Sequence, residues 1–103
     1  MANSKGSDAH FLSGSQTVTT AGTAVALLTT GDFIWRAIVI VAKDNNSGKI
    51  FVGGSTVAST TNRGLAAGDS IELEPTAGKY IQLDDIFIDS AVNSEGVDFY
   101  AVK

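Results

Sequence analysis

The chain contains no cysteine, which excludes disulfide bonds and thiolate metal sites. Its single histidine, His10, lies in a polar N-terminal stretch, where a histidine general base would not be held in place. The longest apolar run, 37–42, is far shorter than the ~20 residues of a membrane helix, so we expect no membrane partner. The N-terminus also lacks the apolar centre of a signal peptide, which predicts synthesis in the cytoplasm.

Basic residues are also scarce. Seven Lys and Arg stand against eleven Asp and Glu, which gives a formal net charge of −4 with the histidine neutral. Proteins that bind nucleic acids neutralise phosphates with a basic face, and the few basic side chains of this chain are scattered. We therefore expect no nucleic-acid partner.

The abundant residues are Thr, Ser, Gly, Val and Ile, which favour strands and turns over helices. At 103 residues the chain has the length of one compact domain. Short apolar segments alternate with turns rich in Gly, Asn and Ser. The sequence therefore predicts an all-β fold, a small antiparallel β-sandwich of jelly-roll type, with about eight short strands over 11–103. A flexible N-terminal arm is expected over 1–10.

The segment 34–43 is the most apolar part of the chain. It is apolar at both alternating sets of positions, which indicates either a central strand covered on both faces or a strand with one face in an oligomer contact. Arg36 is the exception on its face, and its guanidinium needs a carboxylate partner or a wet edge. Trp35 and Arg36 are therefore candidates for a partner interface.

Turn residues predict two hairpins. Residues 44–48 supply Asn and Gly, which tolerate the positive φ angles of a tight reversal, so we expect 50–54 to return and pair with 34–43. Near the C-terminus, 85–90 and 97–102 flank a polar segment and are expected to form the second hairpin.

Some side chains could in principle be catalytic or bind a metal, but a structural role explains each of them better. Glu72 and Glu74 lie about 7 Å apart along one strand, but neighbouring outward residues cannot flank a cleft as glycosidase carboxylates do, so a solvated face is favoured. Asp84 and Asp85 are expected at a turn. Residues 44–48 resemble the start of a calcium loop, yet the bidentate Glu that should follow is missing. We therefore expect no enzyme activity, no metal and no cofactor.

Three further aromatic residues are candidates for a partner interface. Tyr80, Phe87 and Tyr100 occupy positions opposite to the apolar residues that best fit the inward faces of their strands. Exposed aromatic rings mark partner surfaces or sugar platforms, because a flat ring buries much area at little cost in entropy. The alternative is that a second layer of the same fold covers these three rings.

Three stretches carry a resemblance to a known class of protein. They are AIVIVAKDNNSGKIFVGGSTV (37–57), GLAAGDSIELEP (64–75) and DIFIDSAVNSEGVDFYAV (85–102). In this order of strand and turn signals the chain resembles small virion proteins of tailed bacteriophages, all-β subunits that decorate or cement the capsid, often as trimers, or build tail and fibre parts.

The resemblance implies a structural protein of the virion, above all a capsid decoration or cement protein at the capsid surface. Its expected partners are further copies of the chain, in a homotrimer, and the major capsid protein. Self-association is also expected from the surplus of apolar positions over what one small core can bury. The alternatives are a carbohydrate- or receptor-binding module of a phage tail or fibre, and an enzyme subunit or unrelated bacterial β-domain.

Overall fold

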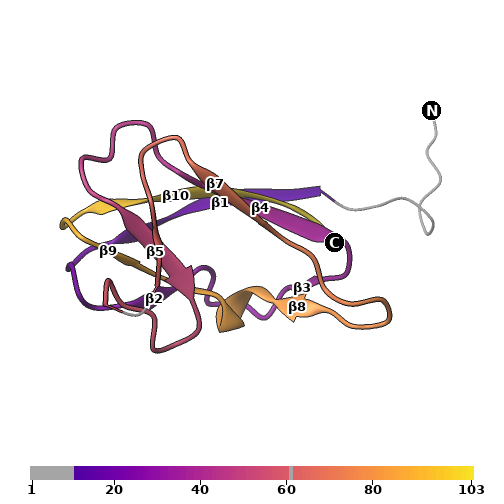
Figure 1. The fold of residues 1–103 in the computed structure, drawn as a ribbon. Coiled ribbons are helices and arrows are strands. Elements are labelled where there is room, and N and C mark those ends of the chain that lie inside the picture. Colours follow the sequence, from indigo (N-terminus) through magenta and orange to yellow (C-terminus); the bar gives the residue numbers. More distant parts are fainter. Residues whose placement is uncertain (1–10, 61) are drawn as a thin grey trace.

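The computed structural model describes residues 11–60 and 62–103, which form ten strands and one 3-10 turn (Figure 1). The expected arm over 1–10, with His10, lies outside the described residues. Within them, no helix is long enough to cross a membrane. The elements are β1 (Phe11–Val18), β2 (Val25–Ala26), β3 (Phe33–Ile34), β4 (Ala37–Ala42), β5 (Ile50–Gly53), β6 (Gly64–Leu65), β7 (Ser70–Leu73), β8 (Ile81–Gln82), η1 (Leu83–Asp85), β9 (Phe87–Ser90) and β10 (Glu95–Val102).

The strands pair as one long antiparallel ribbon that is wound on itself. Within the ribbon β1 pairs with β10, β2 with β9, β3 with β8, β4 with β7, and β5 with β6. Winding adds the β10–β4 and β9–β5 pairs, which creates sheet A (β1-β10-β4-β7) and sheet B (β2-β9-β5-β6). This is the jelly-roll arrangement, so the expected antiparallel sandwich is confirmed. The short β3–β8 ribbon adds two strands to the eight of the main sheets.

The core lies between sheets A and B (Figure 1). Alternate residues of β4 and β10 point into it, among them Ile40 and Phe99. Gly14 of β1 lies opposite Phe99, and a Cβ at that glycine would lie 2.7 Å from Phe99 Cζ, so a side chain would collide with the ring. The buried cluster consists of Val18, Leu27, Ile34, Ile38, Ile40, Ala42, Ile50, Leu83, Ile86, Ile88, Val97, Phe99 and Ala101.

Both predicted hairpins are wrong. The segments 34–43 and 50–54 do not pair, because β4 belongs to sheet A whereas β5 belongs to sheet B. The segments 85–90 and 97–102 are separated in the same way, since β9 lies in sheet B and β10 in sheet A. The turns after β4 and β9 therefore carry the chain from one sheet to the other. The physical reason is that burying the inner faces of all four strands requires two stacked layers, which a flat hairpin cannot provide.

Side chains hold these two connections together at one corner of the sandwich. We define the corner as residues 43–49 and 91–94. The Glu95 carboxylate, at the start of β10, accepts hydrogen bonds from Ser47 N at 2.7 Å, Ser47 Oγ at 2.8 Å and Gly48 N at 2.9 Å. A polar side chain of one sheet thus satisfies backbone donors of the turn that leads to the other sheet, in place of the expected ladder.

The apolar segment 34–43 is not one strand, because a bend at Trp35 and Arg36 separates β3 from β4. The alternation of faces nevertheless continues through the bend, with Ile34 and the inner residues of β4 fully buried. β4 is a central strand of sheet A, between β10 and β7, as one interpretation predicts. Its outer residues, including Val39, are only half-buried, so no second layer of the described chain covers this face. The described chain therefore does not supply cover on both faces, and the other interpretation, an oligomer contact on one face, stays a prediction.

Candidate functional site

Three exposed aromatic rings lie together on the β3–β8 ribbon, and we call them the aromatic face: Phe33, Trp35 and Tyr80. Phe33 and Trp35 flank the buried Ile34 and so project to the opposite side. Tyr80 precedes β8 and lies 4.6 Å from Phe33 and 5.0 Å from Trp35 between ring centroids. The exposed fractions are 42% for Phe33, 52% for Trp35 and 46% for Tyr80, which is unusual for rings that could pack inward.

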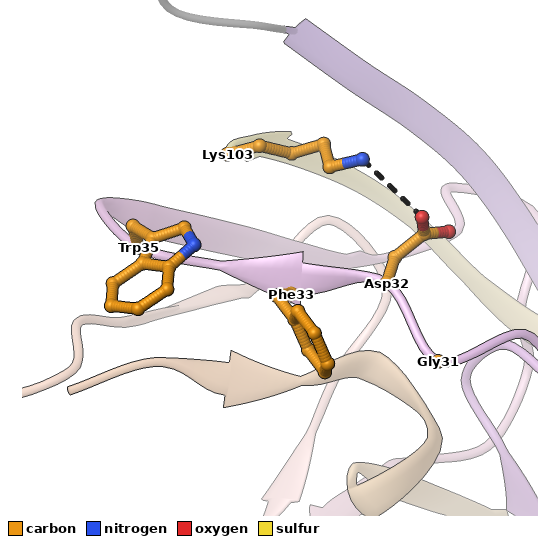
Figure 2. Close-up of a pocket in the computed structure, with 5 residues that line it drawn as sticks. All are labelled: Gly31, Asp32, Phe33, Trp35 and Lys103. Atoms are coloured by element: carbon orange, nitrogen blue, oxygen red, sulfur yellow. Dashed lines mark hydrogen bonds and ion pairs between the residues drawn. The ribbon is translucent and has the colours of Figure 1, made fainter.

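An open cleft of about 420 Å³ adjoins the aromatic face and is lined by Gly31, Asp32, Phe33, Trp35 and Lys103. Figure 2 shows the Lys103 side chain reaching toward Asp32, while the two rings extend from the residues that follow. Lys103 Nζ lies 3.3 Å from Asp32 Oδ1. The other carboxylate oxygen, Oδ2, accepts a hydrogen bond from Thr30 Oγ1 at 3.1 Å, which orients the carboxylate. One side of the cleft is therefore aromatic and another carries a fixed pair of opposite charges.

A second apolar surface lies on the outer face of sheet A. The register places Phe11 beside Val102 and Val102 beside Ala37, and the next outward row places Tyr100 beside Val39. Phe11 is 70% exposed and Tyr100 is 46% exposed. We call these five residues the apolar end of sheet A. Three neighbouring strands contribute to it, so its members form one continuous patch rather than scattered apolar residues.

The other end of the same face is more polar, although Val41 of β4 lies there between Asp98 and Ser70. There Asp98 of β10 lies beside Ser15 of β1 and forms an ion pair of 3.2 Å with Lys43, just after β4. Ser70 of the edge strand β7 is exposed at this level. The outer face of sheet A therefore changes from polar to apolar along its strands, so its two ends differ in the surface that they present.

The structure brings together some of the residues predicted from sequence and separates others. Trp35 and Tyr80 contact each other on the aromatic face. Arg36 is exposed on the bend next to Trp35, which is the wet edge that was expected. Tyr100 is exposed at the apolar end of sheet A. Phe87 lies on sheet B between β2 and β5. Its side chain is half-buried, whereas an exposed ring was predicted.

Sequence reasoning missed two residues of these surfaces. Phe33 belongs to the aromatic face, and its position two residues before Trp35 was the signal that could have found it, because both flank Ile34. Phe11 has the largest exposed fraction among the exposed large hydrophobic side chains of the described residues. Its pairing with Val102 could not be seen before the register was known.

The acidic residues considered for catalysis do not form a site. Glu72 is exposed on the outer side of β7, as predicted, and Glu74 just after it is exposed too. Asp84 and Asp85 belong to the η1 turn, where turn residues were predicted. In the calcium-like loop, Asn46 Oδ1 accepts a hydrogen bond from Gly96 N at 3.3 Å. Across residues 11–60 and 62–103, no group of three His, Cys, Asp or Glu side chains could hold a metal ion.

Comparison with known proteins finds no relative: no family model, no curated protein and no solved structure matches the chain. The resemblance to phage virion proteins, carried by 37–57, 64–75 and 85–102, therefore stays a prediction. Of what it implies, the structure shows the all-β sandwich.

Proposed function

We propose that this chain is a structural subunit of a tailed-bacteriophage virion, a decoration or cement protein that binds the major capsid protein at the capsid surface. The observation that carries the proposal is the apolar end of sheet A. In a chain of net charge −4 with only seven basic residues, a continuous apolar patch across three strands favours burial against protein.

The composition of the patch fits a docking surface. Tyr100 is a large, half-exposed ring of the kind that dominates binding energy in interfaces. It lies beside the half-buried Val39, and Phe11 extends the patch to the edge strand β1. The ion pair between Lys43 and Asp98 marks where the apolar surface ends. A polar border around an apolar centre is the usual anatomy of a protein interface.

The fold also suits a subunit whose role is mechanical. Each main sheet consists of four antiparallel strands, and the Glu95 carboxylate joins the two sheets at the corner through Ser47 and Gly48. The proposed role needs no catalytic group, metal or cofactor. It needs a body that keeps its shape and an apolar surface held in a fixed orientation, and sheet A supplies such a surface.

The test is binding to undecorated capsids assembled from the major capsid protein of a tailed bacteriophage. The variant Tyr100→Ala should weaken capsid binding at least about tenfold in a co-sedimentation titration, because it removes the largest ring of the patch. The matched control is Tyr80→Ala, which removes the same side chain with the same 46% exposed fraction from the aromatic face. This control should bind capsids as the unmodified protein does.

Two results would contradict the proposal. One is that the unmodified protein does not sediment with capsids at any concentration. The other is that Tyr100→Ala and Tyr80→Ala bind equally well. Melting curves of both variants establish that each is folded, so that a loss of binding reports on the surface rather than on stability.

A further inference from the structure

We infer that the cleft beside the aromatic face is a binding site for a neutral hexopyranose, as a single sugar or the end of a glycan. This activity is separate from the proposed role in the capsid, since it uses the β3–β8 ribbon rather than the outer face of sheet A. The residues that carry it are Trp35, Asp32 and Lys103, which line one cleft (Figure 2).

The first step of the argument is the shape and lining of the cleft. Its volume of about 420 Å³ lies near the lower end of the range for small-molecule sites, which suits one or two sugar rings. A pyranose ring has a face of C–H groups that packs on an aromatic ring. Trp35, 52% exposed, offers such a ring, and Tyr80 supports it at a centroid distance of 5.0 Å.

The second step is the polar pair. A sugar hydroxyl can donate to a carboxylate and accept from an ammonium at the same time. Asp32 Oδ1 and Lys103 Nζ are 3.3 Å apart, so one hydroxyl, or two neighbouring ones, could contact both groups. Such hydrogen bonds are charge-assisted and therefore stronger than those between neutral groups. Thr30 holds the second carboxylate oxygen, which leaves Oδ1 directed toward Lys103.

Stability does not explain this arrangement. The Asp32 and Lys103 side chains are about one-third exposed, and ion pairs at such positions contribute little to folding. Three aromatic rings that remain 42–52% exposed also contribute less to the core than buried rings would. Aromatic side chains beside a few placed polar groups are instead the usual lining of a small-molecule site.

The charges select the class of ligand. The cleft contains one acidic and one basic side chain, so it has no surplus of positive charge for a phosphate, a sulfate or an acidic sugar. Bases of a nucleic acid could stack on Trp35, but strand binding also requires a basic groove along the backbone. A neutral sugar satisfies both parts of the site, the ring through its C–H face and the ion pair through its hydroxyls.

The experiment uses the fact that Trp35 is the only tryptophan of the chain, so its fluorescence reports on the cleft alone. The full chain is titrated with the methyl glycosides of glucose, galactose and mannose. At least one of them should change the Trp35 emission in a saturable way. The variant Asp32→Asn, which keeps the shape but removes the charge, should raise the dissociation constant about tenfold.

Tyr100→Ala is the matched control, because it removes an equally exposed ring outside the cleft, and it should leave the dissociation constant unchanged. Calorimetry with Trp35→Ala gives a second readout, in which the heat of binding should disappear. The side chain is half-exposed, so this variant should remain folded, and a melting curve checks that it does.

Three results would overturn the inference. No saturable change of emission with any of the sugars is the first. An equal response of Asp32→Asn and the unmodified protein is the second. The third is that Trp35→Ala abolishes capsid binding while no sugar binds, which would make the aromatic face a protein-docking surface. The sugar titration contains no capsid, so its failure and a failure of the proposed function are distinguishable.

Discussion

Glu95 is the residue with the clearest electrostatic signature. Its carboxylate accepts hydrogen bonds from the backbone of Ser47 and of Gly48, and these bonds lower its pKa below the ordinary value of 4.5. The Ser47 hydroxyl lowers this pKa further, and desolvation opposes the shift. Because the folded pKa lies below the unfolded one, the ionised carboxylate stabilises the fold above the unfolded pKa. This stabilisation is lost as the pH falls through the folded pKa.

The variant Glu95→Gln should therefore lower the melting temperature at neutral pH, since it removes the charge that the Ser47 and Gly48 donors stabilise. The difference from the unmodified protein should shrink once the pH falls below the lowered pKa of Glu95, where both side chains are neutral. Thermal melts across the acidic range measure this. Glu72→Gln is the control, because Glu72 is exposed on an edge strand, and it should change little. A difference that stays constant with pH would contradict the account.

Among the elements, the corner is the place where the chain passes from one sheet to the other. Asn46 binds the start of β10 through both groups of its amide: Nδ2 donates to Gly96 O at 2.8 Å, and Oδ1 accepts from Gly96 N at 3.3 Å. The Asn46 side chain therefore makes the two hydrogen bonds to the Gly96 backbone that a neighbouring strand would otherwise make. Gly96 is also the only residue that fits there, because a Cβ would collide with the Gln16 carbonyl oxygen of β1.

We expect Asn46→Ala to destabilise the fold by about 2 kcal/mol, because two partly buried hydrogen bonds are lost and Gly96 N is left without its acceptor. Urea denaturation followed by Trp35 fluorescence measures the change. The control is Asn45→Ala, an exposed neighbour in the same turn, which should lie within about 0.5 kcal/mol of the unmodified protein. Equal stabilities of the two variants would show that the amide does not hold the corner.

At the scale of the whole molecule, apolar surface concentrates at one end. Phe11, Val102 and Ala37 lie in one row of sheet A, and Lys103, which directly follows Val102, pairs with Asp32 of the cleft. The apolar end of sheet A and the cleft therefore approach each other at the C-terminal end of β10. The homotrimer that the resemblance implies would bury part of the apolar end of sheet A between copies and leave the rest for the capsid.

Light scattering tests the self-association, with the trimer expected at about three times the 10.6 kDa of one chain. Val39→Lys introduces a charge into the patch, on an outward position of β4 opposite Glu72, and should reduce the mass to that of a monomer. Ser15→Lys introduces the same charge at the polar end, beside Asp98, and should leave the mass unchanged. A monomeric unmodified protein would contradict the expected homotrimer.

Composition and alternation alone determined the fold class and most of the inner face. The buried residues of β9 and β10, such as Ile88 and Phe99, were predicted from the period of two, because local sequence sets which side of a strand each residue occupies. The exposed positions of Tyr80 and Tyr100 follow from the same alternation. Composition also predicted almost no helix, and in the described residues the only helical element is the η1 turn.

Only the tertiary structure decided which strands pair. A turn rich in Asn and Gly after β4 favours a hairpin locally, yet β5 pairs with β6 and β9, because the inner face of sheet A can be buried only by a second sheet. The cleft is also tertiary in origin. Asp32 and Lys103 are separated by most of the chain, and Trp35 meets Tyr80 only because β3 pairs with β8. Pairing between distant strands depends on the whole fold, whereas alternation within a strand depends on neighbouring residues alone.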